Sequence, residues 1–259
     1  MLELISLLLL GIFSGFMAGL LGVGGGLIIV PALLYLLAGD VEQSILMQTA
    51  IGTALATIVF TSLSSVWAHH RHGAIYWHYF IKLTPSILLG AFSGAMIAKY
   101  LSFGFLQIFF AIFEIIVALI MWFGISASRH ADNLSRWTWV ATGYVIGLIS
   151  AIVGIGGGTM TTPFLTYNKV AIKNAIATSA ATGLPIAIAG SIGFIVAGWH
   201  TNTENSLGFV HIEALLSIVL MSVIFAPFGA KVAHSVDNSQ LKKFFAVFLV
   251  LLGVAVLSF

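Results

Sequence analysis

Two glycine-rich runs are the residues of this sequence best suited to chemistry. They read Gly22-Val23-Gly24-Gly25-Gly26 and Gly154-Ile155-Gly156-Gly157-Gly158, and a proline, Pro31 or Pro163, follows each run. A turn that leads into a helix offers free N–H groups and the positive end of a helix dipole, which together suit an anion. Glycine also lets a ligand approach the backbone closely and permits positive φ. We interpret the following glycines as an anion-binding site: Gly24, Gly25, Gly26, Gly156, Gly157 and Gly158. Tight helix packing is the alternative interpretation.

Threonines form a second candidate group. Thr49, Thr53 and Thr57 are four residues apart and therefore lie on one face of a helix. The second half of the chain repeats the last two as Thr178 and Thr182. Hydroxyl groups can donate hydrogen bonds to an anion without adding a buried charge. We therefore add Thr53, Thr57, Thr178 and Thr182 to the candidate site; hydrogen bonds to preceding carbonyls or between helices are the alternative.

Glu114 lies in the middle of the apolar segment 105–124. An ionised side chain at the centre of a membrane helix costs about 3 kcal/mol on insertion scales, so we expect it to face the bundle interior. It is a candidate carrier of a coupling proton, or else a neutral structural residue. Its counterpart in the second half is Leu249, so it lies outside the repeated pattern.

The remaining polar residues predict neither a metal nor a cofactor. His69, His70, His72 and His78 crowd one loop, but adjacent histidines rarely converge on one ion, so we expect a solvated basic interface there. The absence of cysteine excludes disulfides and thiolate sites. Neither glycine run is followed by the Lys-Ser/Thr pair of a nucleotide-binding loop.

The elements that must position these residues are membrane helices. Hydrophobic residues make up 60% of the 259 residues, charged residues only 7%, and the mean hydropathy is +1.11. A soluble domain carries about 25% charged residues, so the composition indicates a polytopic membrane protein. The net charge of +2 is too small to suggest a nucleic-acid partner. No cleavage site follows the first apolar segment, which we expect to stay in the mature protein.

Ten apolar stretches follow one another along the chain. Two of them, near 27–38 and 159–167, are too short to cross about 30 Å of hydrocarbon as helices. We expect these two to be the return arms of re-entrant hairpins whose glycine tips lie within the membrane. The others lie near 2–21, 45–67, 81–99, 105–124, 137–153, 174–197, 212–230 and 243–259. All six tryptophans fall near segment ends, as an interfacial aromatic belt requires.

The two halves of the chain are repeats. Residues 50–57, Ala-Ile-Gly-Thr-Ala-Leu-Ala-Thr, match residues 175–182, Ala-Ile-Ala-Thr-Ser-Ala-Ala-Thr. We predict an all-α membrane protein with one transmembrane domain, built from repeats 1–126 and 127–259. Each repeat is a glycine-tipped hairpin followed by three transmembrane helices, so each crosses the membrane an odd number of times. The repeats are therefore inverted relative to each other.

The distribution of basic residues agrees with this topology. The predicted inverted arrangement places nine of the ten on one side and leaves only Lys99 opposite. By the positive-inside rule, both termini are then outside a plasma membrane of the bacterial inner-membrane type. The nine are Arg71, Lys82, Arg129, Arg136, Lys169, Lys173, Lys231, Lys242 and Lys243.

These features together resemble the sulfite exporter TauE/SafE family, also called the 4-toluene sulfonate uptake permeases. The resemblance rests on the doubled G-[VI]-G-G-G with its proline, the A-I-x-T sequence and a late Leu-x-x-Phe-Phe-Ala, and it covers essentially the whole chain. It implies secondary transport of sulfite, sulfonates or related organosulfur anions across the plasma membrane, with export in several members and uptake in others. Its motif positions are Gly22, Gly24, Gly25, Gly26, Pro31, Gly154, Gly156, Gly157, Gly158 and Pro163.

The residues themselves favour an anion without naming it. No Lys or Arg lies in the middle of a span, so amides, hydroxyls and helix N-termini would hold the ligand, with protons as a candidate coupling ion. An anion channel of the same fold and a transporter of another small anion remain alternatives. An enzyme is not expected, because apart from Glu114 the spans lack acids, bases or metal ligands that could converge.

Overall fold

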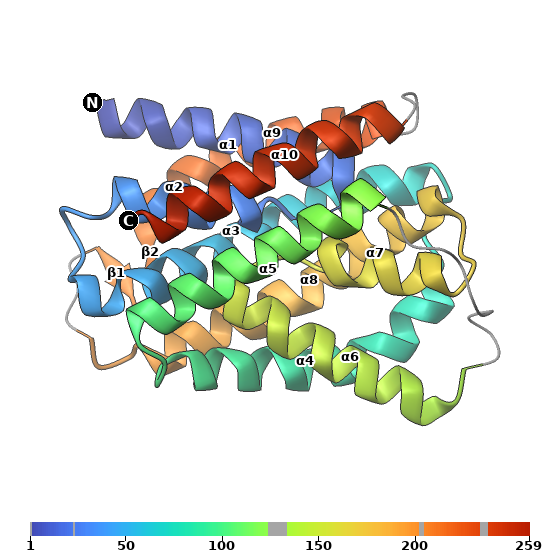
Figure 1. Ribbon diagram of the computed structural model, residues 1–259, viewed down its shortest axis with the longest axis horizontal. Coiled ribbons are helices and arrows are strands. Elements are labelled where there is room, and N and C mark those ends of the chain that lie inside the picture. The colour runs from blue at the N-terminus through green and yellow to red at the C-terminus, as the bar shows by residue number, and fades with distance from the viewer. Residues whose placement is uncertain (1, 23, 124–133, 202–204, 234–237) are drawn as a thin grey trace.

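The computed structural model describes residues 2–22, 24–123, 134–201, 205–233 and 238–259 (Figure 1). The predicted boundary between residues 126 and 127 lies outside this part of the chain, as do Arg129 and the side chains of Lys242 and Lys243. Ten helices and one short hairpin are seen within it. The helices are α1 (Leu2–Leu21), α2 (Gly26–Leu36), α3 (Gln43–Arg71), α4 (Trp77–Ala98), α5 (Phe103–Phe123), α6 (Arg136–Val153), α7 (Gly158–Tyr167), α8 (Ile172–Ala197), α9 (Ile212–Ala233) and α10 (Asn238–Leu257).

The architecture is that of a helical multi-pass membrane protein, as predicted. Within the described residues, seven helices are long and apolar enough to cross a membrane: α1, α3, α4, α5, α6, α8 and α9. The strands β1 (Ser206–Leu207) and β2 (Val210–His211) pair antiparallel in the connection between α8 and α9. Both chain termini lie at the same end of the molecule (Figure 1).

Two short helices begin directly after the glycine runs. α2 has 11 residues and α7 has 10, which correspond to lengths of about 16 and 15 Å at 1.5 Å per residue. Each contains the proline identified in the sequence, Pro31 or Pro163. Neither helix is long enough to cross a bilayer alone.

The longest helices, α3 and α8, form the centre of the molecule. They have 29 and 26 residues and pack against each other. A larger share of each is buried inside the molecule than of any other candidate membrane span. The surrounding helices repeat their contacts between the halves. The contact of α1 with α9 corresponds to the contact of α6 with α4. In the same way, the contact of α9 with α3 corresponds to the contact of α4 with α8. Helices from opposite halves therefore interlock throughout the bundle.

Small residues allow these close helix crossings. A Cβ built at Gly15 of α1 would lie 2.5 Å from the backbone oxygen of Ser222 on α9, and Gly19 lies against the Ala226 carbonyl in the same way. In the second half, Gly147 of α6 lies against the Ile87 carbonyl of α4. The ridge of Gly11, Gly15 and Gly19 is thus a packing surface. Small residues at four-residue spacing are typical of close helix packing in membranes.

One tryptophan departs from the predicted aromatic belt. Trp139 is 3% exposed, whereas the other five tryptophans are well exposed near helix ends. Its ring stacks on Tyr79 with centroids 5.3 Å apart and meets Phe164 edge to face. The Lys82 ammonium lies 5.3 Å from the same ring. Position near a segment end therefore does not by itself place this side chain toward lipid.

Candidate anion site at the glycine loops

The two glycine runs meet at the centre of the bundle. We call residues 22–26 the first glycine loop and residues 154–158 the second glycine loop. A Cβ built at Gly24 would lie 3.1 Å from the Gly156 Cα and 3.1 Å from Ile58, halfway along α3. Gly26 lies against the Gly154 carbonyl oxygen. Segments that are half a chain apart in the sequence thus form one site.

The first glycine loop has a backbone that favours glycine. Gly22, Gly24 and Gly25 have φ values of +67°, +81° and +84°, and no space remains for a side chain at Gly26. Packing and backbone conformation therefore account for these glycines. For this loop the observed packing agrees with the alternative interpretation of the sequence, and anion binding stays a prediction. Features other than the glycines themselves must therefore indicate a ligand.

Unpaired backbone donors are such a feature. Among the described residues, no acceptor is found for the N–H groups of Gly24, Gly25 and Gly26, or for those of Gly156, Gly157 and Gly158. The first bonds at each helix start run to the Gly25 carbonyl, from Ile28 and Ile29, and to the Gly157 carbonyl, from Thr161. Free N–H groups at two adjoining helix N-termini produce a local positive potential without any charged side chain. This arrangement is suited to an anion.

Thr53 and Thr178 make matching hydrogen bonds between the two halves. The Thr53 hydroxyl oxygen on α3 accepts from the backbone N–H of His211 at 2.9 Å. The Thr178 oxygen on α8 accepts from the backbone N–H of Tyr76 at the same distance. His211 and Tyr76 immediately precede α9 and α4. Both hydroxyls thus anchor the loop that leads into a long helix of the opposite half.

The other two predicted threonines bond within their own helices. Thr57 donates to the Thr53 carbonyl at 2.9 Å, and Thr182 donates to the Ser179 carbonyl at 2.9 Å. Thr182 lies beside the second glycine loop, because a Cβ built at Gly157 would be 2.5 Å from its Oγ1. Of the four threonines, this one has the closest described contact with a glycine loop.

A group of hydroxyls that the sequence analysis did not select lies beside the first glycine loop. Thr61, Ser62 and Ser65 of α3 line a small cavity together with Gly22 and Gly24. The cavity is closed in this conformation and too narrow for a water molecule. A signal was present in the sequence, because Thr61 and Ser65 continue the four-residue spacing of Thr49, Thr53 and Thr57.

Glu114 lies away from the glycine loops, between α5 and α10. It is fully buried, and neither carboxyl oxygen has a hydrogen-bond partner among the described residues. A Cβ built at Gly253 of α10 would lie 3.4 Å from Glu114 Oε2. The side chain thus faces the bundle interior, as expected for an acidic residue in a membrane helix.

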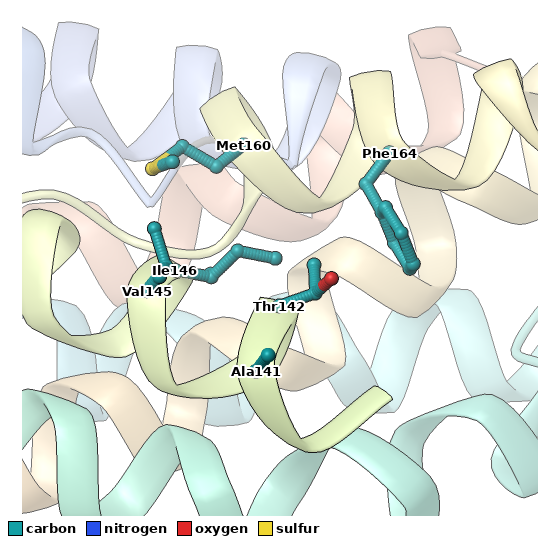
Figure 2. A pocket seen from close by; sticks show the side chains of 6 residues that line it. All are labelled: Ala141, Thr142, Val145, Ile146, Met160 and Phe164. Atoms are coloured by element: carbon teal, nitrogen blue, oxygen red, sulfur yellow. The ribbon is translucent and has the colours of Figure 1, made fainter. Parts of the chain in front are cut away.

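Two other regions offer no comparable arrangement. In the described part of the chain, no three His, Cys, Asp or Glu side chains are grouped so as to hold a metal ion. A cavity of about 320 Å³ lies between α6 and α7, and Figure 2 shows its lining residues: Ala141, Thr142, Val145, Ile146, Met160 and Phe164. Thr142 supplies the single side-chain hydroxyl among them. This cavity lacks the donors that an anion requires.

The fold and the paired glycine loops define a multi-pass membrane protein with a polar site at the centre of its helices. The sequence matches the sulfite exporter TauE/SafE family over residues 7–256, and the chain belongs to this family. A Haemophilus influenzae protein named "Probable membrane transporter protein" is 39% identical over 251 residues, which cover 95% of each chain. The Bacillus subtilis protein YdhB, with the same description, is 30% identical over 96% of each chain.

A more distant relative has the same description. The Methanocaldococcus jannaschii protein MJ0441, also named "Probable membrane transporter protein", is 26% identical over 97% of this chain and 94% of its own length. No solved structure matches the chain significantly. The family and these relatives indicate a membrane transporter rather than an enzyme.

Proposed function

We propose that this protein is a secondary transporter that exports sulfite, a sulfonate or a related organosulfur anion across the plasma membrane. The observation that carries the proposal is the meeting of the two glycine loops, whose N–H groups have no acceptor among the described residues. The three oxygens of a sulfonate match several convergent donors. Membership of the sulfite exporter TauE/SafE family supports this choice of anion.

The proposed site consists of the glycine loops and the adjoining threonines. Gly24, Gly25, Gly26, Gly156, Gly157 and Gly158 supply N–H groups. Thr57 and Thr182 join the site by exchanging a bond to a backbone carbonyl for one to the anion. Thr53 and Thr178 take part while their oxygens remain acceptors for His211 and Tyr76, because each hydroxyl still has a hydrogen to donate.

An inverted repeat would allow access from both sides of the membrane. The α1–α2 hairpin opens toward one end of the molecule and the α6–α7 hairpin toward the other (Figure 1). The exchange of helix contacts between the halves and the distribution of basic residues support the same arrangement. We propose that both hairpins are re-entrant, that both termini are outside, and that movement of one half against the other exposes the central site alternately.

Glu114 is the proposed carrier of a coupling proton. Its carboxyl group is buried without a hydrogen-bond partner among the described residues, so a charge there would be costly in this conformation. Proton uptake and release at Glu114 would therefore accompany a change in the packing of α5 on α10. Such a link between protonation and helix packing is what coupling requires.

A flux assay tests the proposed function. The purified protein is reconstituted into liposomes, and flux of sulfite, taurine and sulfate is measured with and without an imposed proton gradient. We expect accumulation of sulfite or taurine against its concentration gradient when the proton gradient is present. Flux that only dissipates a substrate gradient would indicate an anion channel. Flux of sulfate alone would indicate a transporter of another small anion.

A further inference from the structure

The small cavity beside the first glycine loop has features that the proposed function does not use. Its lining consists of Thr61, Ser62 and Ser65 of α3, Ala18, Gly22 and Gly24 of the first hairpin, and Ala180 and Gly183 of α8. Helices of both halves thus enclose it, next to the point where the two glycine loops meet. None of these described lining residues carries a charge.

Ser65 is the unusual member of this lining. Its side chain is 2% exposed, and its Oγ has no hydrogen-bond partner among the described residues. The neighbouring hydroxyl of Thr61 is already used, because it donates to the Thr57 carbonyl at 3.1 Å and pairs with Ser222 Oγ at 2.8 Å. A buried hydroxyl without a partner costs free energy that a bound ligand can recover. Ser65 Oγ–H and the Gly24 N–H, neither of which has a partner among the described residues, thus belong to two residues that line one cavity.

The second half does not repeat these three α3 hydroxyls. In the repeat that aligns Thr57 with Thr182, the positions matching Thr61, Ser62 and Ser65 are Ile186, Ala187 and Gly190. Four hydroxyls near the second glycine loop bond one another. Thr162 donates to Ser179 Oγ at 2.9 Å, and Thr182 donates to Thr161 Oγ1 at 3.3 Å. Ser150 and Thr159, which flank the second glycine loop, are also buried without a partner for the hydroxyl among the described residues, but neither lines this cavity.

We propose that the transported anion binds in this cavity, held by the Ser65 hydroxyl and the N–H groups of the first glycine loop, with Ser62 beside it. This inference rests on the proposed function and names the subsite that it leaves open. Because the second half does not repeat the α3 hydroxyls of the lining, the first half supplies the hydroxyl donor, and the second half closes over the anion through Gly156 and Gly183. A cation is disfavoured, because the described lining contains no carboxylate.

The absence of cysteine allows a direct test. In Ser65→Cys the new thiol is the only one in the protein, and its reaction is measured with two methanethiosulfonate reagents. One reagent has an ethylsulfonate group and is an anion; the other has an ethylammonium group and is a cation. Ser150→Cys is the matched control, because Ser150 is also buried with no partner for its Oγ in the described structure, yet it does not line the cavity.

We expect Ser65→Cys to react with the anionic reagent in membranes, and taurine to protect it. Relative to a free thiol in solution, the anionic reagent should be favoured over the cationic one by about tenfold or more, as for a site with positive potential. Ser150→Cys should react with neither reagent. A lack of reaction at Ser65→Cys, or a preference for the cationic reagent, would overturn the proposal.

A second variant separates this inference from the proposed function. Ser65→Ala should weaken the stabilisation of the protein by taurine or sulfite about tenfold, the loss expected for one hydrogen bond to a charged ligand, and Ser150→Ala should not. If wild-type liposomes transport neither sulfite nor taurine while Ser65→Cys still selects the anionic reagent, the substrate class is wrong and the anion site stands. If transport occurs and Ser65→Ala binds as tightly as wild type, the site is wrong and the function stands.

Discussion

The Thr53 hydroxyl oxygen on α3 accepts a hydrogen bond from the backbone N–H of His211, which directly precedes α9, at 2.9 Å. Thr178 on α8 and Tyr76 before α4 repeat this bond at the same distance. Each central helix thus holds the entry to a long helix of the other half. Because both bonds cross between halves, any rearrangement of one half against the other acts on them directly.

Loss of these anchors should destabilise the protein. Thr53→Val keeps the shape of the side chain but leaves the buried His211 N–H without an acceptor, at a cost of about 1–3 kcal/mol. We expect a lower Tm in detergent for Thr53→Val and for Thr178→Val. Thr84→Val is the control, because the Thr84 hydroxyl bonds only to the Phe80 carbonyl of its own helix. An unchanged Tm in both anchor variants would show that the bonds contribute nothing.

His211 should make stability depend on pH. Burial lowers the pKa of the His211 imidazole, and Glu213, Asp40 and Glu3 partly oppose that shift. Its Nδ1 also accepts the Ala214 N–H at 3.2 Å. Because the folded-state pKa is below the unfolded value of about 6.5, the unfolded state takes up the proton first. The stability that His211 contributes is therefore fully present above the unfolded-state pKa. It is lost as the pH falls from there through the lower folded-state pKa.

His211→Asn separates the effect of His211 titration from the effect of its hydrogen bond to the Ala214 N–H at the start of α9. His211→Asn retains an acceptor for the Ala214 N–H but does not titrate. We expect the wild-type Tm to fall more than the variant Tm between roughly pH 7.5 and pH 5.5. Equal losses in the two proteins would contradict a role for His211.

The membrane topology can be read with single cysteines. Asp40 lies between α2 and α3, and His72 lies between α3 and α4; both are exposed. If both termini are outside, a membrane-impermeant thiol reagent should label Asp40→Cys in intact cells and His72→Cys only after permeabilisation. Reporters at the two termini should both read outside, and one in the loop 126–135 should read inside. Termini on opposite sides would end the inverted-repeat proposal.

Glu114→Gln tests proton coupling. Glutamine preserves the size and polarity of the buried side chain but cannot carry a proton. We expect this variant to lose flux driven by a pH gradient while it still exchanges substrate across the liposome membrane. Wild-type dependence on the pH gradient in Glu114→Gln would make Glu114 a structural residue of the α5–α10 contact.

Much of the fold could be predicted because hydrophobicity and glycine carry strong local signals. The apolar segments and the short helices after the glycine runs follow from length, composition and spacing alone. The specific contact of Gly24 with Gly156 could not be predicted, because contact between segments half a chain apart leaves no local pattern in the sequence. For the same reason, the sequence could not separate glycines that serve packing from glycines that bind a ligand.

The site was less predictable for a related physical reason. A threonine in a helix can bond its own backbone, anchor a distant loop or face a ligand, and spacing is the same in all three cases. Thr57 takes the first role in the described conformation and Thr53 the second. Ser65 extends the same stripe, but its lack of a partner emerges only from the surrounding helices.

Ligand binding by glycine-loop variants tests most directly whether these loops hold the anion. At Gly25 an added methyl group meets positive φ and the Ser14 carbonyl oxygen at 3.0 Å, and at Gly157 it meets Thr182 Oγ1 at 2.5 Å. Gly25→Ala and Gly157→Ala should shift the N–H groups and weaken stabilisation by sulfite or taurine about tenfold or more, while the proteins still insert. Gly15→Ala should instead lower the yield and the ligand-free Tm, because Gly15 packs against α9. If both loop variants are stabilised by ligand as strongly as wild type, the glycine loops are packing elements and do not bind the anion.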